Sequence, residues 1–341
     1  MKLSDYNYIL PESLIADVPP KIRGTSRLLV LNRKTGKTID SNYSNISDFL
    51  KAGDVLVIND TKVIKARLKV KKENGTKREI ILLEKHSFDN DWYSHRIMYR
   101  RKLNKGDILT IGDARIIVEE IQGDGLAIIR SDHDLLKIAD IYGEVPLPPY
   151  MHREATPLDI NRYQTIWAND NGSVAAPTAS LNMTDQILDS LRQKGIIIVN
   201  LTLHVGLGTF MPIRTDNIED HNIHKEYFEV PADTVKVIQE AKYQGGRVIA
   251  LGTTVARTLE YVNNLFVQPP TDLSGEADIF IYPGYKFQVI DGLLTNYHSP
   301  KSTVLMLTAA FAGWDKLLPA YNYAVEQKYK FFSYGDSMLI L

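Results

Sequence analysis

The segment Arg247–Glu260 reads RVIALGTTVARTLE, and the order of its residue types decides the fold. Its first part, Arg247–Leu251, is an apolar run with the length and composition of a buried strand. Gly252 follows, where a tight turn favours a residue without a side chain, and a helix then begins near Val255 and carries Arg257. A strand that passes through a short turn into a helix is the repeating unit of α/β layer structures, so this segment predicts an α/β domain.

The same alternation of helices and strands extends to both sides of this segment. Upstream, Thr184 can cap a helix that ends at Gly195, and the strand Ile196–Val205 and the helix Asp233–Tyr243 follow. Further expected elements share the same apolar patterning: the strands Arg27–Asn32, Asp54–Asn59, Ile279–Tyr282 and Ser337–Leu341, and the helices Thr303–Phe311 and Lys316–Tyr329. The two flanks of the chain therefore predict one layered α/β domain.

Between Lys62 and Arg130 the pattern changes to short alternating strands without helices. Turns rich in Gly, Asn and Asp punctuate this region, in which we expect the strands Ala66–Val70, Glu79–Leu83, Trp92–Met98, Ile108–Ile111, Arg115–Ile121 and Leu126–Arg130. The proline-rich connector Gly143–Tyr150, GEVPLPPY, cannot continue a sheet. We therefore predict an α/β main domain formed by residues 1–59 and 151–341, with an inserted all-β, small barrel-like domain of residues 60–150.

The composition excludes several kinds of chemistry. The 341 residues include no cysteine, which rules out disulfides, thiolate nucleophiles, Cys-ligated zinc and iron–sulfur clusters. The longest late apolar run, Val304–Gly313, is shorter than the ~20 residues that a membrane-spanning helix needs, and acidic residues and prolines interrupt the N-terminus where a signal peptide would be apolar. We therefore expect a soluble, cytoplasmic protein with no membrane partner, and we expect it to be a monomer.

The charges are unevenly distributed although the net charge is only −1. Residues 61–105 hold 14 Lys and Arg against 5 Asp and Glu, a difference of +9, whereas the rest of the chain holds 26 against 36, a difference of −10. A compact basic patch is typical of a protein that binds a polyanion. A solvated, lysine-rich face of a sheet would have the same composition, so the charge alone leaves both interpretations open.

Three of the eight histidines and a glutamate fall close together: His204 at the end of a strand, and His221, His224 and Glu226 in an H-x-x-H-x-E sequence. Three imidazoles and a carboxylate could ligate zinc, or they could transfer protons near neutral pH. The spacing is not the i, i+4 pair of a helical zinc site, which favours proton transfer. We therefore predict that these four residues are catalytic and that no metal is required.

Loops rich in glycine and small residues lie on both sides of this cluster. The Gly206–Thr209 turn lets backbone N–H groups approach a ribose or an anion, and the Gly252–Thr254 turn leads into a helix N-terminus that can bind a ligand. In Asp278–Lys301, tyrosines offer stacking surfaces beside Asn296 and His298. Ordinary turns and close packing would explain each of these loops equally well.

Long stretches of the chain resemble, in the same order, the S-adenosylmethionine:tRNA ribosyltransferase-isomerases, a bacterial family of queuosine synthesis. The matching stretches cover nearly the whole chain: YILPESLIADVP, SRLLVL, GDVLVINDTKVIKARL, GEVPLPPY, RYQTIWANDNGSVAAPTA, LTLHVGLGTF, HNIHKEYFEV, GGRVIALGTT, RTLE, DIFIYPGYKF, DGLLTNYHSPKST and KFFSYGDSMLI. So many long collinear matches are highly specific.

The resemblance implies a reaction with S-adenosylmethionine as co-substrate. Its ribosyl group is transferred to 7-aminomethyl-7-deazaguanine at the wobble position of a tRNA and isomerised, which gives epoxyqueuosine and releases adenine and methionine. The sulfonium acidifies the adjacent 5′ carbon, so a base can generate an ylide that expels adenine. The amine then attacks, and closure of the epoxide releases methionine. This chemistry needs a base and a proton donor but neither a thiol nor a metal.

We assign candidate binding residues, most of them in the matching segments, to the two substrates. S-adenosylmethionine and the base are expected to contact Pro177, Thr178, Gly206, Gly208, Thr209, Arg214, Thr253, Thr254, Arg257, Tyr282, Asn296, His298 and Lys301. The tRNA phosphates are expected to contact Arg27, Lys62, Arg67, Arg101 and Lys102.

The chain also departs from the family pattern. Asn182 stands where the family commonly has histidine, Met211 where it has arginine, and Tyr99–Lys102 replaces a Pro-Gly-Lys-Arg stretch. The resemblance is therefore to a somewhat divergent member. It leaves open a paralogue with an altered base or donor, a metal-dependent hydrolase that uses the histidine cluster, and a tRNA-binding module without catalysis.

Overall fold

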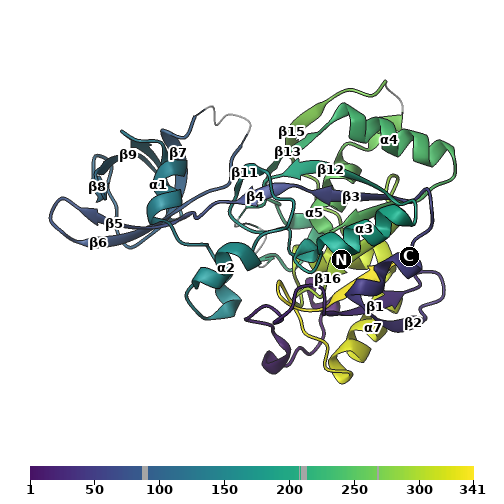
Figure 1. Ribbon diagram of the computed structural model, residues 1–341. Helices are drawn as coiled ribbons and strands as arrows, with labels where there is room; N and C mark the ends of the chain where they lie inside the picture. The colour runs from purple at the N-terminus through teal and green to yellow at the C-terminus, as the bar shows by residue number, and fades with distance from the viewer. Residues whose placement is uncertain (87–90, 207, 209–212, 267–268) are drawn as a thin grey trace.

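A computed structural model shows a layered α/β body joined to a β-barrel (Figure 1). It describes residues 1–86, 91–206, 208, 213–266 and 269–341. The barrel lies at the left of Figure 1, and the large sheet with its helices forms the right-hand part, where both chain termini lie. The predicted fold class, an α/β domain with an inserted all-β barrel, is confirmed.

The α/β body is built on a nine-stranded mixed sheet. Its strands lie in the order β15 (Leu273–Ala277), β13 (Glu226–Val230), β12 (Ile197–Leu203), β3 (Val55–Asn59), β14 (Val248–Leu251), β16 (Gly292–Asn296), β17 (Ser337–Ile340), β1 (Arg27–Leu31) and β2 (Thr38–Asn42). The four neighbours β12, β3, β14 and β16 are parallel; Val55 of β3 pairs with Ile197 on one side and with Val248 on the other. The carboxyl ends of these four strands therefore lie at one edge of the sheet.

Alternating side chains of the central strands bury both faces of the sheet. On β3, Val55 and Val57 belong to one core and Leu56 and Ile58 to the other, and all four are buried. The first core is shared with α4 (Ala232–Tyr243), α5 (Thr253–Tyr261), α6 (Thr303–Ala312) and α7 (Trp314–Glu326). The second is shared with α3 (Asp185–Gln193) and the 3-10 helix Tyr43–Phe49. In the described part of the chain, no helix has the length and apolar character of a membrane span.

The second body is a closed barrel of six antiparallel strands. They follow the order β10 (Leu126–Ser131), β7 (Ser94–Arg100), β6 (Lys77–Leu82), β5 (Arg67–Lys72), β8 (Ile108–Ile111) and β9 (Ala114–Gly123). On β5, Leu68 and Val70 are buried in the barrel core, whereas Lys69 and Lys71 are exposed. The helix α1 (Leu135–Tyr142) adds Leu135 to the same core.

Short segments connect the two bodies. The strand β4 (Thr61–Val63) directly follows β3 and pairs in parallel with β11 (Asp170–Ser173), and α2 (Pro157–Arg162) lies on the return path. Beyond β6, the backbone N–H of Lys85 donates to the carbonyl of Gly172 (2.9 Å), which ties the barrel back to β11. The barrel strands occupy residues 67–131. The division of the chain at residues 59/60 and 150/151 stays a prediction.

The predicted strand Ile279–Tyr282 is wrong, because these residues belong to no strand and the neighbouring β15 ends at Ala277. The guanidinium of Arg257 donates to the carbonyls of Ala277 (2.7 Å) and Ile279 (3.1 Å), so these acceptors serve a side chain instead of a strand partner. The sheet also contains β2, β13, β15 and β16, which the sequence patterning did not reveal.

Glu260 of α5 holds the irregular segment that leads into β16. Its buried carboxylate accepts the backbone N–H groups of Gln288 (2.9 Å), Val289 (2.9 Å) and Ile290 (3.0 Å). The hydroxyl of Tyr285 donates to the same carboxylate at 3.1 Å. Hydrogen bonds to an ionised acceptor are about twice as strong as neutral ones, so one side chain fixes the approach to β16.

Glu260→Gln is expected to lower the free energy of unfolding by about 2 kcal/mol or more, because the new amide N–H₂ would face backbone N–H groups that need an acceptor. Urea denaturation measures the change. Glu240→Gln on the exposed face of α4 is the matched control and should change stability by less than about 0.5 kcal/mol. Equal unfolding midpoints for Glu260→Gln and the unsubstituted chain would contradict this role.

Candidate functional site

A cleft of about 510 Å³ lies at the carboxyl edge of the parallel strands. Its walls come from the turn after β14, the end of β16 and the following loop, the loop before α3, and the neighbourhoods of Tyr150 and Phe332. Seven of the predicted ligand-binding residues line it: Pro177, Thr178, Thr253, Thr254, Asn296, His298 and Lys301. The volume is typical of small-molecule sites, and the position is the one where α/β sheets bind ligands.

Hydrogen bonds hold polar groups in place around this cleft. The hydroxyl of Thr178 donates to Asn296 Oδ1 (2.9 Å), which joins the loop before α3 to the end of β16. Thr253 and Thr254 form the first turn of α5, where backbone N–H groups have no partner within the helix. Such a helix N-terminus suits a hydroxyl or an anionic oxygen.

His298 reaches the cleft as a neutral ring. Its Nε2 lies 2.9 Å from the hydroxyl of Thr295, and its backbone N–H donates to the hydroxyl of Tyr321 (3.2 Å). Burial lowers the pKa of His298 to about 3. The imidazole is therefore uncharged at neutral pH and can offer a hydrogen bond but no positive charge.

Two residues that line the cleft have left-handed backbone conformations: Lys301 at φ 58° and Phe332 at φ 71°. Residues with a Cβ lose roughly 1–2 kcal/mol in this region, and such strain clusters at functional sites. Lys301 is exposed, and no carboxylate in the described part of the chain lies within ion-pair distance of its amino group. It is the positive charge that the cleft can offer to an acidic ligand.

A smaller cavity of about 50 Å³ adjoins the cleft, and the two share Thr253, Thr254 and Val304 as lining residues. Besides these two threonines, five of the predicted site residues line it: Gly208, His221, His224, Glu226 and Arg257. The structure thus brings the H-x-x-H-x-E sequence beside the ligand-sized cleft.

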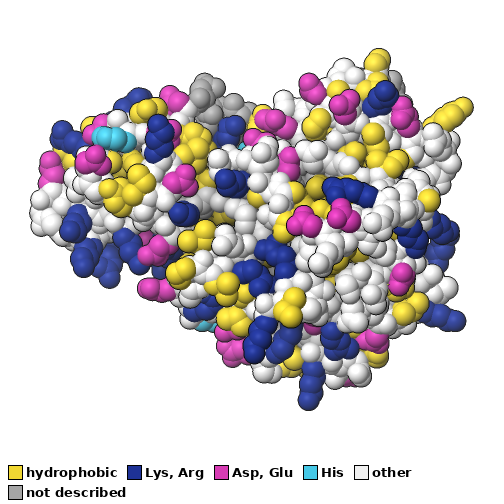
Figure 2. Space-filling model, viewed as in Figure 1, with side chains coloured by type: hydrophobic (Ala, Val, Ile, Leu, Met, Phe, Trp, Pro, Cys, Tyr) yellow, Lys and Arg dark blue, Asp and Glu magenta, His cyan; other side chains and the backbone are white. Residues whose placement is uncertain are grey.

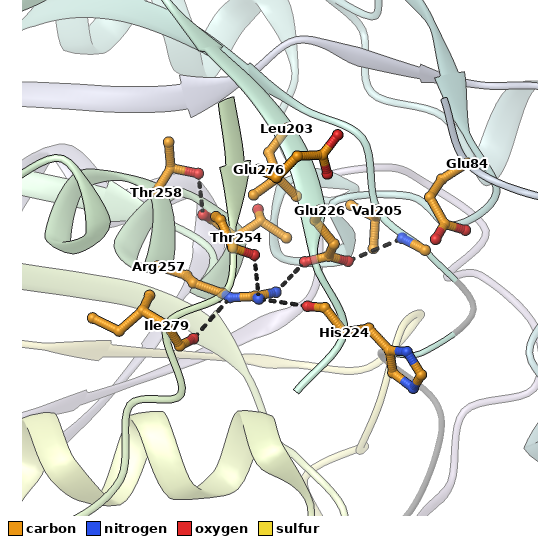
Figure 3. Close-up of polar contacts among 12 residues, drawn as sticks. Glu84, Leu203, Val205, His224, Glu226, Thr254, Arg257, Thr258, Glu276 and Ile279 are labelled. Carbon is orange, nitrogen blue, oxygen red and sulfur yellow. Dashed lines mark hydrogen bonds and ion pairs between the residues drawn. The ribbon is translucent and has the colours of Figure 1, made fainter. Parts of the chain in front are cut away.

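Glu226 and Arg257 form a buried ion pair (Figure 3). Arg257 also donates to the carbonyls of His224 (2.7 Å), Ala277 (2.7 Å) and Ile279 (3.1 Å). The other carboxylate oxygen of Glu226 accepts the backbone N–H of Gly206 at 2.9 Å. The pair therefore fixes the backbone around both histidine segments. Removing one partner of such a pair typically costs about 3–5 kcal/mol, because the remaining charge stays buried.

His204 is buried and lines neither cavity. Its Nδ1 lies 2.8 Å from the hydroxyl of Thr61, which donates to Ser173 Oγ at 2.9 Å. The ring packs so closely on Gly172 that a Cβ there would lie 2.7 Å from three of its atoms. Burial, with Lys85 and His86 nearby, lowers the pKa of His204 to about 3. His204 is therefore neutral at physiological pH.

His221 and His224 face the small cavity from the segment before β13. The ring of His221 contacts that of Phe280 edge-on at 5.2 Å; its pKa is lowered by burial and then by His224. The ring of His224 is exposed and passes 2.3 Å from the position that a Cβ of Gly208 would take. Within the described residue ranges, no three His, Asp or Glu side chains are arranged to hold a metal ion, and the expectation that no metal is required stays a prediction.

The remaining ligand-binding predictions lie apart from both cavities or outside the described residues. Arg214 is exposed and lines neither cavity, and Tyr282 packs against Phe280 with ring centroids 5.3 Å apart. Thr209 and the departure Met211 lie outside the described residues.

The departure Asn182 has a packing role in the structure. It is buried; its Oδ1 accepts from the hydroxyl of Ser26 (2.7 Å), and its Nδ2 donates to the carbonyl of Gly335 (3.1 Å). Asn182 lines neither cavity.

The predicted phosphate-binding residues fall into two groups. Arg27 and Arg67 have partners within the chain: Arg27 pairs with Asp40 (3.1 Å) and stacks on Tyr329, and Arg67 pairs with Glu79 (3.1 Å). The others are exposed and have no described carboxylate within 4 Å: Lys62 on β4, and Arg101 and Lys102 after β7. Figure 2 shows Lys and Arg side chains gathered along the lower edge of the barrel, over β5 and β6.

A charged cluster between the two bodies escaped the sequence reasoning. His86 lies 3.3 Å from Glu84 Oε1 and 2.9 Å from Glu276 Oε2 on β15, and Arg96 approaches the same ring at 3.0 Å. Burial alone would lower the pKa of His86, but the carboxylates of Glu84 and Glu276 raise it. The local sequence LEKH carries no signal for this contact, because the partner Glu276 comes from a distant strand.

Comparisons by family model, by sequence and by structure all find similarity to the same group of proteins. A family model described as queuosine biosynthesis protein matches residues 3–340. The S-adenosylmethionine:tRNA ribosyltransferase-isomerase of Chlorobium phaeobacteroides is 51% identical over 345 residues, and that of Halothermothrix orenii is 48% identical over 348 residues; both alignments cover 100% of each chain. A crystal structure of S-adenosylmethionine tRNA ribosyltransferase from Thermotoga maritima is 33% identical, with a TM-score of 0.57, and covers 99% of this chain and 100% of that chain.

Proposed function

The chain belongs to the queuosine biosynthesis protein family, and from this membership we propose that it transfers and isomerises the ribosyl group of S-adenosylmethionine onto 7-aminomethyl-7-deazaguanine at the wobble position of a tRNA. Epoxyqueuosine forms in the tRNA, and adenine and methionine are released. The observation that carries the proposal is the match along residues 3–340, with relatives of about half-identical sequence that bear this enzyme name.

We place S-adenosylmethionine in the 510 Å³ cleft. The hydroxyl and amide groups of Thr178 and Asn296 suit the ribose hydroxyls, and the amino group of Lys301 suits the methionine carboxylate. The neutral ring of His298 can hydrogen-bond to a leaving adenine. These contacts bind and orient the donor, and correct orientation lowers the barrier to such a transfer.

We assign proton transfer to His221 and His224 of the adjoining cavity. A base must take a proton from the 5′ carbon beside the sulfonium, and a donor must protonate adenine as it leaves. Glu226 and Arg257 stabilise the backbone beside the two histidines, because Arg257 donates to the His224 carbonyl and Glu226 accepts the Gly206 N–H. Glu226 was predicted to be catalytic and Arg257 to bind substrate; in this proposal both residues instead position the two histidines.

The proposal includes a monomeric, cytoplasmic protein that requires no metal. A paralogue with an altered base or donor is the principal alternative, and the buried place of Asn182 argues against it because this departure touches neither cavity. The metal-dependent hydrolase remains a second alternative, which a chelator distinguishes.

Nucleoside analysis tests the proposed function. Protein purified without a histidine tag is incubated with S-adenosylmethionine and tRNA that carries 7-aminomethyl-7-deazaguanine. The tRNA is then digested to nucleosides, which are identified by mass spectrometry. We expect epoxyqueuosine together with equal amounts of adenine and methionine. The same tRNA with guanine at the wobble position is the control and should release no adenine. Failure to release adenine from the modified tRNA would overturn the proposal.

Alanine substitution separates the roles of the histidines. If His221 or His224 is the base, its alanine variant should turn over ~100–10,000-fold more slowly while tRNA still binds, because general-base assistance is typically of this size. His204→Ala should instead lower stability and leave the turnover of the folded protein nearly unchanged, since the ring packs on Gly172 and is held by Thr61. Single-turnover assays with melting curves measure both quantities.

The assignment fails if His221→Ala and His224→Ala both keep near-normal turnover. Treatment with EDTA is expected to leave the rate unchanged. Activity that is lost with EDTA and restored by zinc would support the metal-dependent alternative.

Charge reversal tests the phosphate contacts of the barrel. Arg101→Glu combined with Lys102→Glu should weaken tRNA binding and lower the slope of log K against log salt by ~1 unit for each lost contact. Lys51→Glu combined with Lys236→Glu reverses two exposed charges of the α/β body and is the matched control. Filter binding at several salt concentrations measures the slopes. An unchanged affinity and slope would mean that the exposed lysines and arginines of the barrel contact only solvent and do not bind tRNA phosphates.

A further inference from the structure

The loop after α7 is pinned at nearly every residue. Phe331 is buried in the core, and its backbone N–H donates to the carbonyl of Leu14 (2.9 Å). The hydroxyl of Tyr334 donates to the buried carboxylate of Asp159 (2.8 Å). Asp336 closes the turn by accepting the backbone N–H of Lys330 at 2.7 Å. The backbone between these anchors has little freedom to relax.

The ring of Phe332 in this loop is half-buried and lines the cleft. Its backbone is held on both sides: the N–H donates to the carbonyl of Tyr297 (3.1 Å), and the carbonyl accepts the N–H of Gly335 (3.0 Å). At φ 71° this is a left-handed position, which glycine adopts without strain and a bulky residue does not. A strained phenylalanine on a cleft wall indicates that the ring itself is used.

Tyr150 stands beside this ring on the same wall. The ring centroids of Tyr150 and Phe332 lie 4.6 Å apart with a tilt of 57°. The Tyr150 hydroxyl is bonded to Ser333 Oγ and accepts the Ser333 backbone N–H at 3.2 Å. Tyr150 is thereby attached to the residue that follows Phe332, and the two rings form one rigid aromatic wall.

We propose that Phe332 and Tyr150 stack a planar, purine-like ring in the cleft. This inference rests on the proposed function, which supplies two such rings: the adenine of S-adenosylmethionine and the 7-deazaguanine of the tRNA. Aromatic side chains hold bases by their faces, whatever hydrogen bonds the base edges make. Thr178 and Asn296 line the same cleft and supply polar groups for the rest of the ligand.

Phe332→Leu tests the stacking wall, because leucine keeps a Cβ and an apolar side chain but has no aromatic face. Isothermal titration measures the dissociation constant for S-adenosylmethionine, and steady-state assays give kcat and the KM for modified tRNA. Loss of one stacked base should weaken binding roughly 5- to 100-fold. An increase only in the dissociation constant for S-adenosylmethionine would identify adenine as the stacked ring. An increase only in the KM for modified tRNA would identify the deazaguanine. Phe332→Tyr keeps the aromatic face and should restore binding in either case.

Phe287→Leu is the matched control. Phe287 is also a half-buried ring, in contact with Phe311 (4.9 Å), but it lines neither cavity. If Phe332→Leu changes both affinities by less than about 3-fold and only lowers stability as Phe287→Leu does, the wall is packing and the inference is overturned. That result leaves the proposed function intact, whereas an unsubstituted chain that neither binds S-adenosylmethionine nor modifies tRNA would overturn the function itself.

Phe332→Trp provides a second measurement if the leucine variant does not fold. Stacking should quench the new indole, so fluorescence should fall on titration with S-adenosylmethionine or modified tRNA, relative to the unsubstituted chain with its three tryptophans. Equal quenching of the two proteins would overturn the inference.

Discussion

The parallel alignment of β12, β3, β14 and β16 determines where the chemistry can lie, because it brings four strand ends to one edge of the sheet. Asn59 fixes this edge: its side chain donates to the carbonyl of Leu203 (3.0 Å) and accepts the Leu203 N–H (3.1 Å), which ties the end of β3 to the end of β12. The loops that leave these strands then have one common space to enclose, and the ligand-sized cleft is that space. The barrel begins directly after β4, which follows the end of β3, so the exposed basic residues of the barrel are attached to the same edge of the sheet.

The Glu226–Arg257 pair holds the backbone at this edge of the sheet. Arg257 was predicted to bind substrate, yet it donates hydrogen bonds to Glu226 and to the carbonyls of His224, Ala277 and Ile279. A buried pair of this kind gives little net stability but is costly to break, so it serves to hold one arrangement. His221 and His224 lie next to this ion pair, and the 510 Å³ cleft adjoins the small cavity that they line.

The fold class could be predicted from the sequence, because the strand–turn–helix patterns and the change to short alternating strands after Lys62 are local signals. The family could be predicted from the long collinear motifs. The environment of each histidine could not. His204 and His224 belong to the same motif-rich region, but one packs on Gly172 and the other faces a cavity, and this difference depends on distant segments. Phe332 was hidden for a similar reason, since its left-handed backbone arises from bonds to Tyr297 and Gly335.

The central claim is that the donor lies at the ends of β14 and β16, beside the two cavity histidines. A crystal structure of the protein with S-adenosylmethionine tests it most directly. The account predicts ligand density between Thr178, Asn296 and Lys301, with the 5′ carbon directed towards the cavity that His221 and His224 line. Density at another place, such as the groove between Thr25 and Thr184, with the cleft left open, would contradict it.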